Sequence, residues 1–267
     1  MRKILVPLIF LFVIITSGAT FAETGKKAPK KTRPVFPKLI QLPSPFNRWN
    51  SCDLALRLYP NYTCNSGRLD EANVGSVEKV AIWNEHGKKH LLALFVKFET
   101  GDKSENSGKS VDIALCDIKD NDITIVAFSK DLISYREYGS SYFDLAPYKF
   151  NSNETAVGVR ANPGISGGGS EEEILYLLRI NGNKFQQIFT RIMFDTEYYG
   201  GYEDLSNKLR TKSILQIVPQ SSGMNDFKII TRYYRINDAD QDENDIVKTT
   251  TELWRWDQNN QAYQLSK

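Results

Sequence analysis

Long apolar segments are nearly absent from this sequence. The one uninterrupted run, Ile4–Ile15, lies close to the amino terminus, and no later segment is long and apolar enough to span a bilayer. Even this run is shorter than the about 20 residues that a helix needs to cross the hydrocarbon core. We therefore expect a soluble mature chain without a transmembrane segment.

Histidine is equally scarce, which limits the chemistry available to the chain. His86 and His90 both precede Gly164–Gly168, whose G-x-S-x-G pattern matches a hydrolase nucleophile elbow, whereas in such enzymes the histidine follows the nucleophile. The two histidines also flank Gly87 in a predicted hairpin turn, while metal-binding pairs at this spacing lie on helices. The sequence thus favours a non-enzymatic protein. A hydrolase built from carboxylates that the fold brings together is the alternative.

A large excess of basic residues is missing from the body of the chain. Residues 49–267 hold 25 Lys and Arg against 31 Asp and Glu. Nucleic-acid-binding domains usually carry a basic patch. We therefore expect no nucleic-acid partner.

The amino terminus has the pattern of an export signal. Two basic residues, Arg2 and Lys3, precede the apolar run, and small residues at Thr20 and Ala22 follow it. This pattern predicts a cleavable signal peptide over residues 1–22, of a bacterial type, with cleavage after Ala22. The mature protein is then expected in the periplasm or outside the cell.

Residues 23–48 are basic and rich in proline, with little apolar periodicity. Such a composition buries too little apolar surface to offset the entropy of ordering, so it predicts an extended linker. A spacer and a basic arm that touches anionic lipid or cell-wall polymer are both compatible with it. A single β domain is expected over residues 49–267.

The chain has three cysteines, and export would permit disulfides. Cys52 and Cys64 are separated by 11 residues, so a bridge between them would close a short loop. Cys116 lies in a strand-like run and is expected to be a buried free thiol. One or two helical turns are expected at 52–58.

From Val77 onward, short runs rich in β-branched and aromatic residues alternate with polar turn clusters. No segment sustains a helical period. The spacing predicts twelve strands in three four-stranded antiparallel units, at about residues 77–130, 142–195 and 212–267. Tight polar turns join the third and fourth strands of each unit, at 119–122, 181–183 and 257–261. Asn181-Gly182 suits a turn with positive φ.

An all-β fold follows from these units. Four-stranded units in series predict a propeller-like array, which normally takes four to eight blades. Three units leave open an incomplete curved array, a β-sandwich, and a ring completed by two chains.

The segments between the units share a composition of tyrosine and glycine. Tyrosine provides large contact area at low entropic cost, and glycine lets a loop adapt to a partner. An alternative is that these rings cover the core between units. The candidate partner-binding residues are Tyr135, Tyr138, Tyr198, Tyr199 and Tyr202.

Acidic residues alternate along one predicted hairpin loop, at Asp238, Asp240, Asp242 and Asp245. The spacing D-x-D-x-D-x-x-D followed by two aliphatic residues, over 238–247, resembles the calcium loop of FG-GAP and VCBS β-propeller repeats. The resemblance implies that these four carboxylates bind Ca²⁺, a cation that prefers oxygen ligands. A solvated acidic hairpin tip is the alternative, and no other cofactor is expected.

These features favour an exported, non-enzymatic protein that binds a macromolecular partner. One form of this function is an inhibitor or immunity protein against a toxin or hydrolase that acts in the periplasm. The alternative is a calcium-dependent carbohydrate or cell-wall binding module. The expected partner is thus a protein or a cell-wall glycan.

Overall fold

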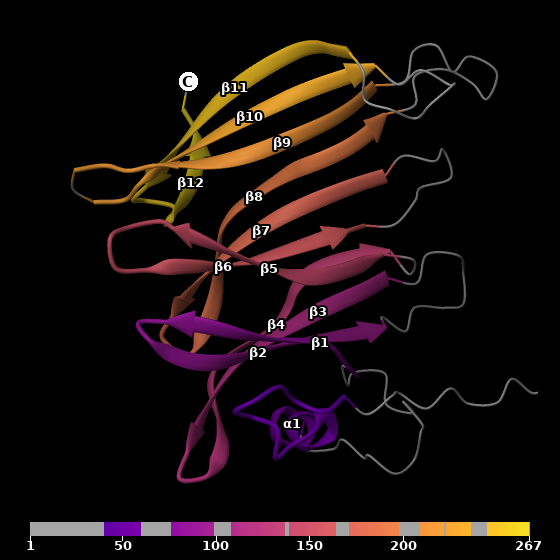
Figure 1. Ribbon diagram of the computed structural model, residues 1–267, viewed down its shortest axis with the longest axis vertical. Coiled ribbons are helices and arrows are strands. Elements are labelled where there is room, and N and C mark those ends of the chain that lie inside the picture. The colour runs from indigo at the N-terminus through magenta and orange to yellow at the C-terminus, as the bar shows by residue number, and fades with distance from the viewer. Residues whose placement is uncertain are drawn as a thin grey trace, which may run out of the picture. The chain divides into compact units, whose positions relative to one another are not determined.

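A computed structural model describes residues 40–59, 76–98, 108–136, 139–163, 171–197, 209–221, 223–235 and 245–266. Two antiparallel sheets and one short helix make up these residues, so the fold is all-β (Figure 1). The helix in the described part of the chain is not long and apolar enough to cross a membrane.

The helix α1, Ser51–Leu58, confirms the predicted helical turns. It begins at Asn50, whose side chain accepts hydrogen bonds from the backbone N–H groups of Cys52 and Asp53. The carboxylate of Asp53 in turn accepts a hydrogen bond from the N–H of Asn50. This capping box satisfies amides that have no partner within the first turn.

Twelve strands follow the helix, each overlapping a strand that the sequence predicts. Their alternation of apolar and polar residues, with turn residues between them, makes them detectable without tertiary information. The strands are β1 Ser76–Glu85, β2 Lys88–Phe98, β3 Gly108–Lys119, β4 Asp122–Arg136, β5 Ser140–Lys149, β6 Thr155–Asn162, β7 Glu171–Asn181, β8 Lys184–Glu197, β9 Leu209–Val218, β10 Asp226–Arg235, β11 Asp245–Asp257 and β12 Ala262–Leu265.

The strands form one sheet of four, β1 to β4, and one sheet of eight, β5 to β12, both in chain order. The first predicted unit is therefore a sheet of its own, but the prediction of separate second and third units is wrong. They are joined because β8 pairs with β9, from Phe194 opposite Lys212 to Glu197 opposite Leu209. Because the second and third units share one sheet, the described residues do not form three separate blades.

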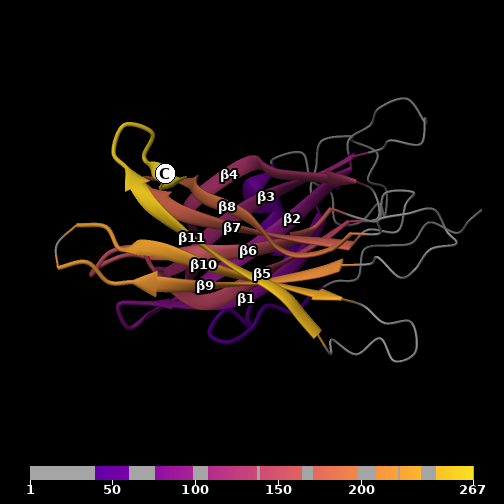
Figure 2. The same cartoon turned by 90° about the horizontal axis from the view of Figure 1, so that it is seen from above.

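Several connections between consecutive strands lie together at one end of the sheets. The turns of β1–β2, β5–β6 and β9–β10 appear at the same side in both views (Figures 1 and 2). Positive φ angles at His86 and Gly87, at Asp120 and Asn121, and at Gly182 reverse the chain tightly. The hairpin predicted around Gly87 is confirmed.

The four-stranded sheet is buried on both sides. Its strands β2 and β3 contain runs of buried residues, Leu91–Val96 and Ser110–Cys116. Alternate residues of these runs belong to two hydrophobic clusters. One cluster includes residues of β6, β7 and β8 from the larger sheet, and the other includes α1.

The eight-stranded sheet contributes to the shared cluster on one side and builds a third cluster on the other. Phe189 of β8 lies at the centre of the third cluster, with ring contacts to Phe227, Trp254 and Tyr263. These contacts join the β5–β8 and β9–β12 halves of the sheet beyond their short β8–β9 pairing.

The folded body begins before residue 49. Leu42 and Phe46 are fully buried in the same cluster as α1, and the N–H of Ser51 donates to the carbonyl of Ile40. The predicted linker over 23–48 is therefore wrong for residues 40–48. Two apolar side chains in a proline-rich stretch are enough to dock it when a helix and a sheet offer a matching surface.

Candidate functional site

A row of side chains crosses the eight-stranded sheet on an exposed side. Glu173 of β7 lies opposite Phe194 of β8, Phe194 opposite Lys212 of β9, and Lys212 opposite Arg232 of β10. Cross-strand partners project from the same side of a sheet and contact one another. We call these four residues the sheet-face row.

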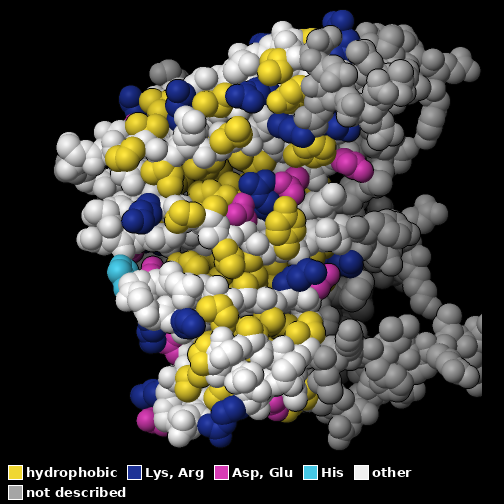
Figure 3. All heavy atoms as spheres, viewed as in Figure 1, with side chains coloured by type: hydrophobic (Ala, Val, Ile, Leu, Met, Phe, Trp, Pro, Cys, Tyr) yellow, Lys and Arg dark blue, Asp and Glu magenta, His cyan; other side chains and the backbone are white. Residues whose placement is uncertain are grey.

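A hollow of about 290 Å³ lies over the sheet-face row. Ile214 is 51% exposed beside it, an unusual state for a large aliphatic side chain, and Lys212 and Arg232 are also exposed. Hydrophobic side chains spread among basic ones over the side of the protein seen in Figure 3. The hollow is lined by Arg160, Glu173, Met193, Phe194, Lys212, Ser213, Ile214, Arg232 and Tyr234.

Arg160 organises one wall of the hollow. Its Nε donates to Asp144 Oδ2 at 2.6 Å, and its Nη1 pairs with Glu173. Tyr142 donates to Glu173 Oε2 at 2.6 Å, and Tyr148 donates to Asp144 Oδ2 at 2.6 Å. Every member of this network has a partner, so the wall is held in one arrangement.

The same network sets the protonation of its groups. Burial alone would raise the pKa of Asp144, but hydrogen bonds from Tyr148 and Arg160 outweigh it and lower the pKa. Burial and the hydrogen bond to Glu173 raise the pKa of Tyr142 to about 12. At neutral pH the carboxylate of Asp144 is charged and the Tyr142 hydroxyl is protonated. A general acid needs a carboxyl pKa raised toward neutrality, and the pKa of Asp144 is shifted in the opposite direction.

Gly158 allows Tyr148 to lie across the strand β6. A Cβ at position 158 would meet the Asp144 carbonyl oxygen at 2.5 Å and a ring carbon of Tyr148 at 2.7 Å. Only glycine leaves room for both. The position of the Tyr148 hydroxyl, and through it that of Asp144, thus depends on this residue.

The strands β9 and β10, on one side of the hollow, are basic. Together β9 and β10 carry five basic residues, Arg210, Lys212, Lys228, Arg232 and Arg235, and one acid, Asp226. The guanidinium of Arg210 lies over the ring of Phe194 at 5.8 Å from its centre. The surface therefore combines cationic donors with aromatic and aliphatic contact area, which suits binding to an acidic surface.

The predicted tyrosine site is contradicted at the one residue that the structure describes. Tyr135 is buried in the cluster shared by the two sheets, and its hydroxyl lies 3.1 Å from Ser141 Oγ. It covers the core, as the alternative interpretation held. Tyr138, Tyr198, Tyr199 and Tyr202 lie outside the described residues.

The predicted calcium site also lies largely outside the described residues. Asp238, Asp240 and Asp242 are not among them, and Asp245 is described only as the first residue of β11, opposite Arg235. Within the described ranges, no group of three or more His, Cys, Asp or Glu residues is placed to hold a metal ion. Calcium binding stays a prediction, which calorimetric titration of the mature protein tests.

The two histidines have different partners. His86 Nε2 lies 2.8 Å from the carbonyl oxygen of Asn153, and His90 Nδ1 lies 2.5 Å from Asp117 Oδ1. Among the described residues, no serine, threonine or cysteine contact completes a nucleophile, base and acid set around His90.

Cys116 is buried and free, as predicted. Burial raises the pKa of its thiol to about 12, so it is unreactive at neutral pH. Cys52 lies in the first turn of α1, and Cys64 lies outside the described residues. Their pairing stays a prediction.

The sheet-face row was not identified from the sequence. In the structure, exposed Lys212 and Ile214 alternate with half-buried neighbours along β9. This alternation within one strand does not reveal which strands lie beside β9. Which side chains form the row depends on the register between strands that are distant in the chain. Neither a protein-family model, a curated protein nor a solved structure matches this chain.

Proposed function

We propose that this chain is an exported, non-enzymatic binding protein that engages an acidic macromolecule through the sheet-face row and its hollow. The observation that carries the proposal is the exposed, ordered surface on which Ile214, Phe194 and Arg232 meet. Aromatic and arginine side chains are the residues that most often dominate binding energy at protein interfaces.

The proposed partner is a protein with an acidic contact surface. Arg232 and Lys228 project from the same side of β10 and favour an acidic contact surface, because complementary charge raises association rates and selects partners. One form of this function is an inhibitor or immunity protein against a toxin or hydrolase in the periplasm. The export signal predicted over residues 1–22 supports a periplasmic or extracellular location.

The scaffold suits such a surface. We infer that the two sheets pack as a β-sandwich, which the cluster shared by β2, β3, β6 and β7 supports. Strands paired on both sides hold the row rigid, so little ordering entropy is lost on binding.

The test is a pull-down from periplasmic extract with matched charge reversals. Arg232→Glu and Ile214→Asp should each reduce capture of a stoichiometric protein partner at least tenfold, since both alter the hollow. Lys89→Glu, an exposed charge reversal on the four-stranded sheet, should leave capture unchanged.

Salt provides a second readout. The captured complex should weaken as ionic strength rises, because exposed charges are screened over about 10 Å at 0.1 M salt. Absence of any stoichiometric partner, or a partner that all three variants retain, would overturn the proposal.

A further inference from the structure

A second hollow, separate from the sheet-face row, lies at the end of the sheets where these connections gather. Its volume is about 650 Å³, and it is widely open to solvent, so it can hold one part of a longer ligand. Three connections build it, those of β5–β6, β9–β10 and β11–β12. It is lined by Asn151, Ser152, Asn153, Gly223, Met224, Asp226, Arg255, Trp256 and Gln258.

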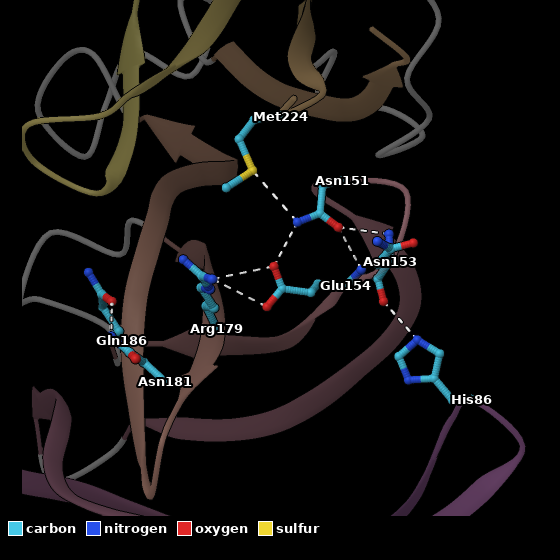
Figure 4. A network of polar contacts seen from close by, with 8 residues as sticks. All are labelled: His86, Asn151, Asn153, Glu154, Arg179, Asn181, Gln186 and Met224. Carbon is cyan, nitrogen blue, oxygen red and sulfur yellow. Dashed lines mark hydrogen bonds and ion pairs between the residues drawn. The ribbon is translucent and has the colours of Figure 1, made fainter. Parts of the chain in front are cut away.

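One wall of this turn-end groove is fixed by hydrogen bonds around Asn151. Its Oδ1 accepts from the N–H groups of Asn153 and Glu154, at 2.8 and 2.7 Å. Its Nδ2 donates to Glu154 Oε2 at 2.6 Å and lies 3.8 Å from the sulfur of Met224 (Figure 4). Arg179 pairs with the Glu154 carboxylate, so the turn keeps its shape.

The opposite wall is aromatic. Trp256 is half-buried and packs edge to face on Tyr263, with ring centres 5.4 Å apart. The Tyr263 hydroxyl donates to the carbonyl of Asn225 at 2.7 Å and lies 3.4 Å from that of Phe150. One side chain therefore ties all three connections together beneath the indole.

The turn-end groove carries no net charge. Asp226 and Arg255 are its one acid and one base, and Arg255 Nε lies 3.8 Å from Asp226 Oδ2. Gln220 also donates to Asp226, at 2.9 Å. The other polar groups of the lining are amides and one hydroxyl, which donate and accept hydrogen bonds without charge.

We propose that the turn-end groove binds a neutral oligosaccharide, with a sugar ring packed against Trp256 and its hydroxyls bonded to Asn153, Gln258 and Arg255. The indole of Trp256 offers an apolar plane for the C–H groups of a sugar, while its N–H donates to Gln258 Oε1 at 3.1 Å and leaves the Gln258 NH₂ for a sugar hydroxyl. Amide and guanidinium groups match hydroxyls, which both donate and accept. A charged ligand would find its counter-charge already paired.

This inference is independent of the proposed protein partner, because the two surfaces share no lining residue. The ligand is neutral in one case and acidic in the other. The turn-end groove should therefore bind equally well at low and high salt, whereas the complex at the sheet-face row should weaken.

The experiment follows the indole N–H signals of the mature protein by NMR during titration with cellotetraose, maltotetraose and N-acetylchitotetraose. The chain has four tryptophans, and each signal is assigned by a single Trp→Phe variant. At least one sugar should shift the Trp256 signal with a Kd near ~1 mM or below. The signal of buried Trp83 should stay in place.

Matched variants locate the site. Asn153→Ala and Gln258→Ala, both exposed, should weaken binding roughly three- to tenfold, the loss expected when one hydrogen bond is removed. Arg232→Glu, in the sheet-face row, should leave sugar binding unchanged. If none of the three sugars moves the Trp256 signal at ~10 mM, or if the Asn153→Ala and Gln258→Ala variants bind as tightly as the parent, the proposal fails.

Discussion

The two sheets of this protein are covered differently. In the four-stranded sheet, β2 and β3 are buried on both sides, and their sequences run nearly continuously apolar. In the eight-stranded sheet, β9 alternates exposed and half-buried residues, and charged side chains occupy the open side. The open sheet carries the sheet-face row, while the buried sheet carries α1 and the segment 40–48.

The difference shows how one strand-forming pattern serves two purposes. A strand that must be covered on both sides has no position free for a charged side chain unless a partner is built for it. A strand with one open side can carry a charged or exposed apolar residue at every second position, because the side chains that pack in the core occupy the other positions. The proposed partner surface is therefore found on the larger sheet.

The largest expected effect is in the buried sheet. Phe95→Ala removes a fully buried ring between Tyr59 and the cluster around α1, and should lower the free energy of unfolding by about 3–5 kcal/mol. Ile214→Ala on the open sheet should change it by less than about 0.5 kcal/mol. Urea denaturation monitored by tryptophan fluorescence measures both, and equal losses would contradict the comparison.

The next largest effect concerns a charged cluster within the buried sheet. Lys97 Nζ lies 2.9 Å from Asp112 Oδ1 and 2.6 Å from Asp131 Oδ1, and Asp112 is fully buried. Lys97→Met should lower the free energy of unfolding by roughly 3 kcal/mol, because it leaves a buried carboxylate without its counter-charge.

Two further variants make this test specific. Adding Asp112→Asn to Lys97→Met should recover part of the loss, since the uncompensated charge is removed. Arg160→Met, which breaks two ion pairs on the open sheet, should cost less than Lys97→Met, because Asp144 and Glu173 keep some contact with solvent whereas Asp112 is fully buried. A larger loss for Arg160→Met than for Lys97→Met would reverse the comparison.

A smaller effect is expected at Gly158. Gly158→Ala places a Cβ against the Asp144 carbonyl oxygen and the Tyr148 ring, and should destabilise by about 1–3 kcal/mol. The midpoint of thermal unfolding should fall by ~2–4 °C per kcal/mol. In the Tyr148→Ala background the same substitution should cost less, because the ring contact is gone. An unchanged midpoint would show that β5 moves freely over β6.

The smallest effect is that of acid on the open sheet. The pKa of Asp144 is lowered below its ordinary value of 3.8 in the folded state, so its ionisation adds stability that is complete above that value. This stability is lost as pH falls through the lower folded-state pKa. Asp144→Asn should therefore flatten the decline of stability below about pH 4, as chemical denaturation at several pH values would show. An identical acid profile in parent and variant would exclude this contribution.

The strands were predictable because they depend on local pattern. Runs such as Leu91–Phe98 and Phe227–Arg235 are rich in residues that favour strands, and Gly87 and Gly223, with positive φ, lie in the connections before them. Helix α1 was detectable too, since Asn50 and Asp53 form its cap within four residues. Each of these signals lies within a short stretch of chain.

Pairing between distant segments was not predictable in the same way. Tyr135 resembled a loop residue in a Tyr- and Gly-rich stretch, yet β4 extends to Arg136 and turns the ring into the core. Leu42 and Phe46 resembled parts of a linker until α1 and the sheet covered them. In each case a partner far along the chain decides the burial.

The sequence by itself determined the all-β class, the twelve strands, the tight turns at 119–122, 181–183 and 257–261, and the buried free thiol of Cys116. These follow from residue periodicity and backbone preference, which act over a few residues. Only the tertiary structure decided that β8 pairs with β9 to make one sheet of eight, and that Phe194, Lys212 and Arg232 stand side by side. Contacts between strands depend on the free energy of burying whole faces together, which no single stretch of sequence contains.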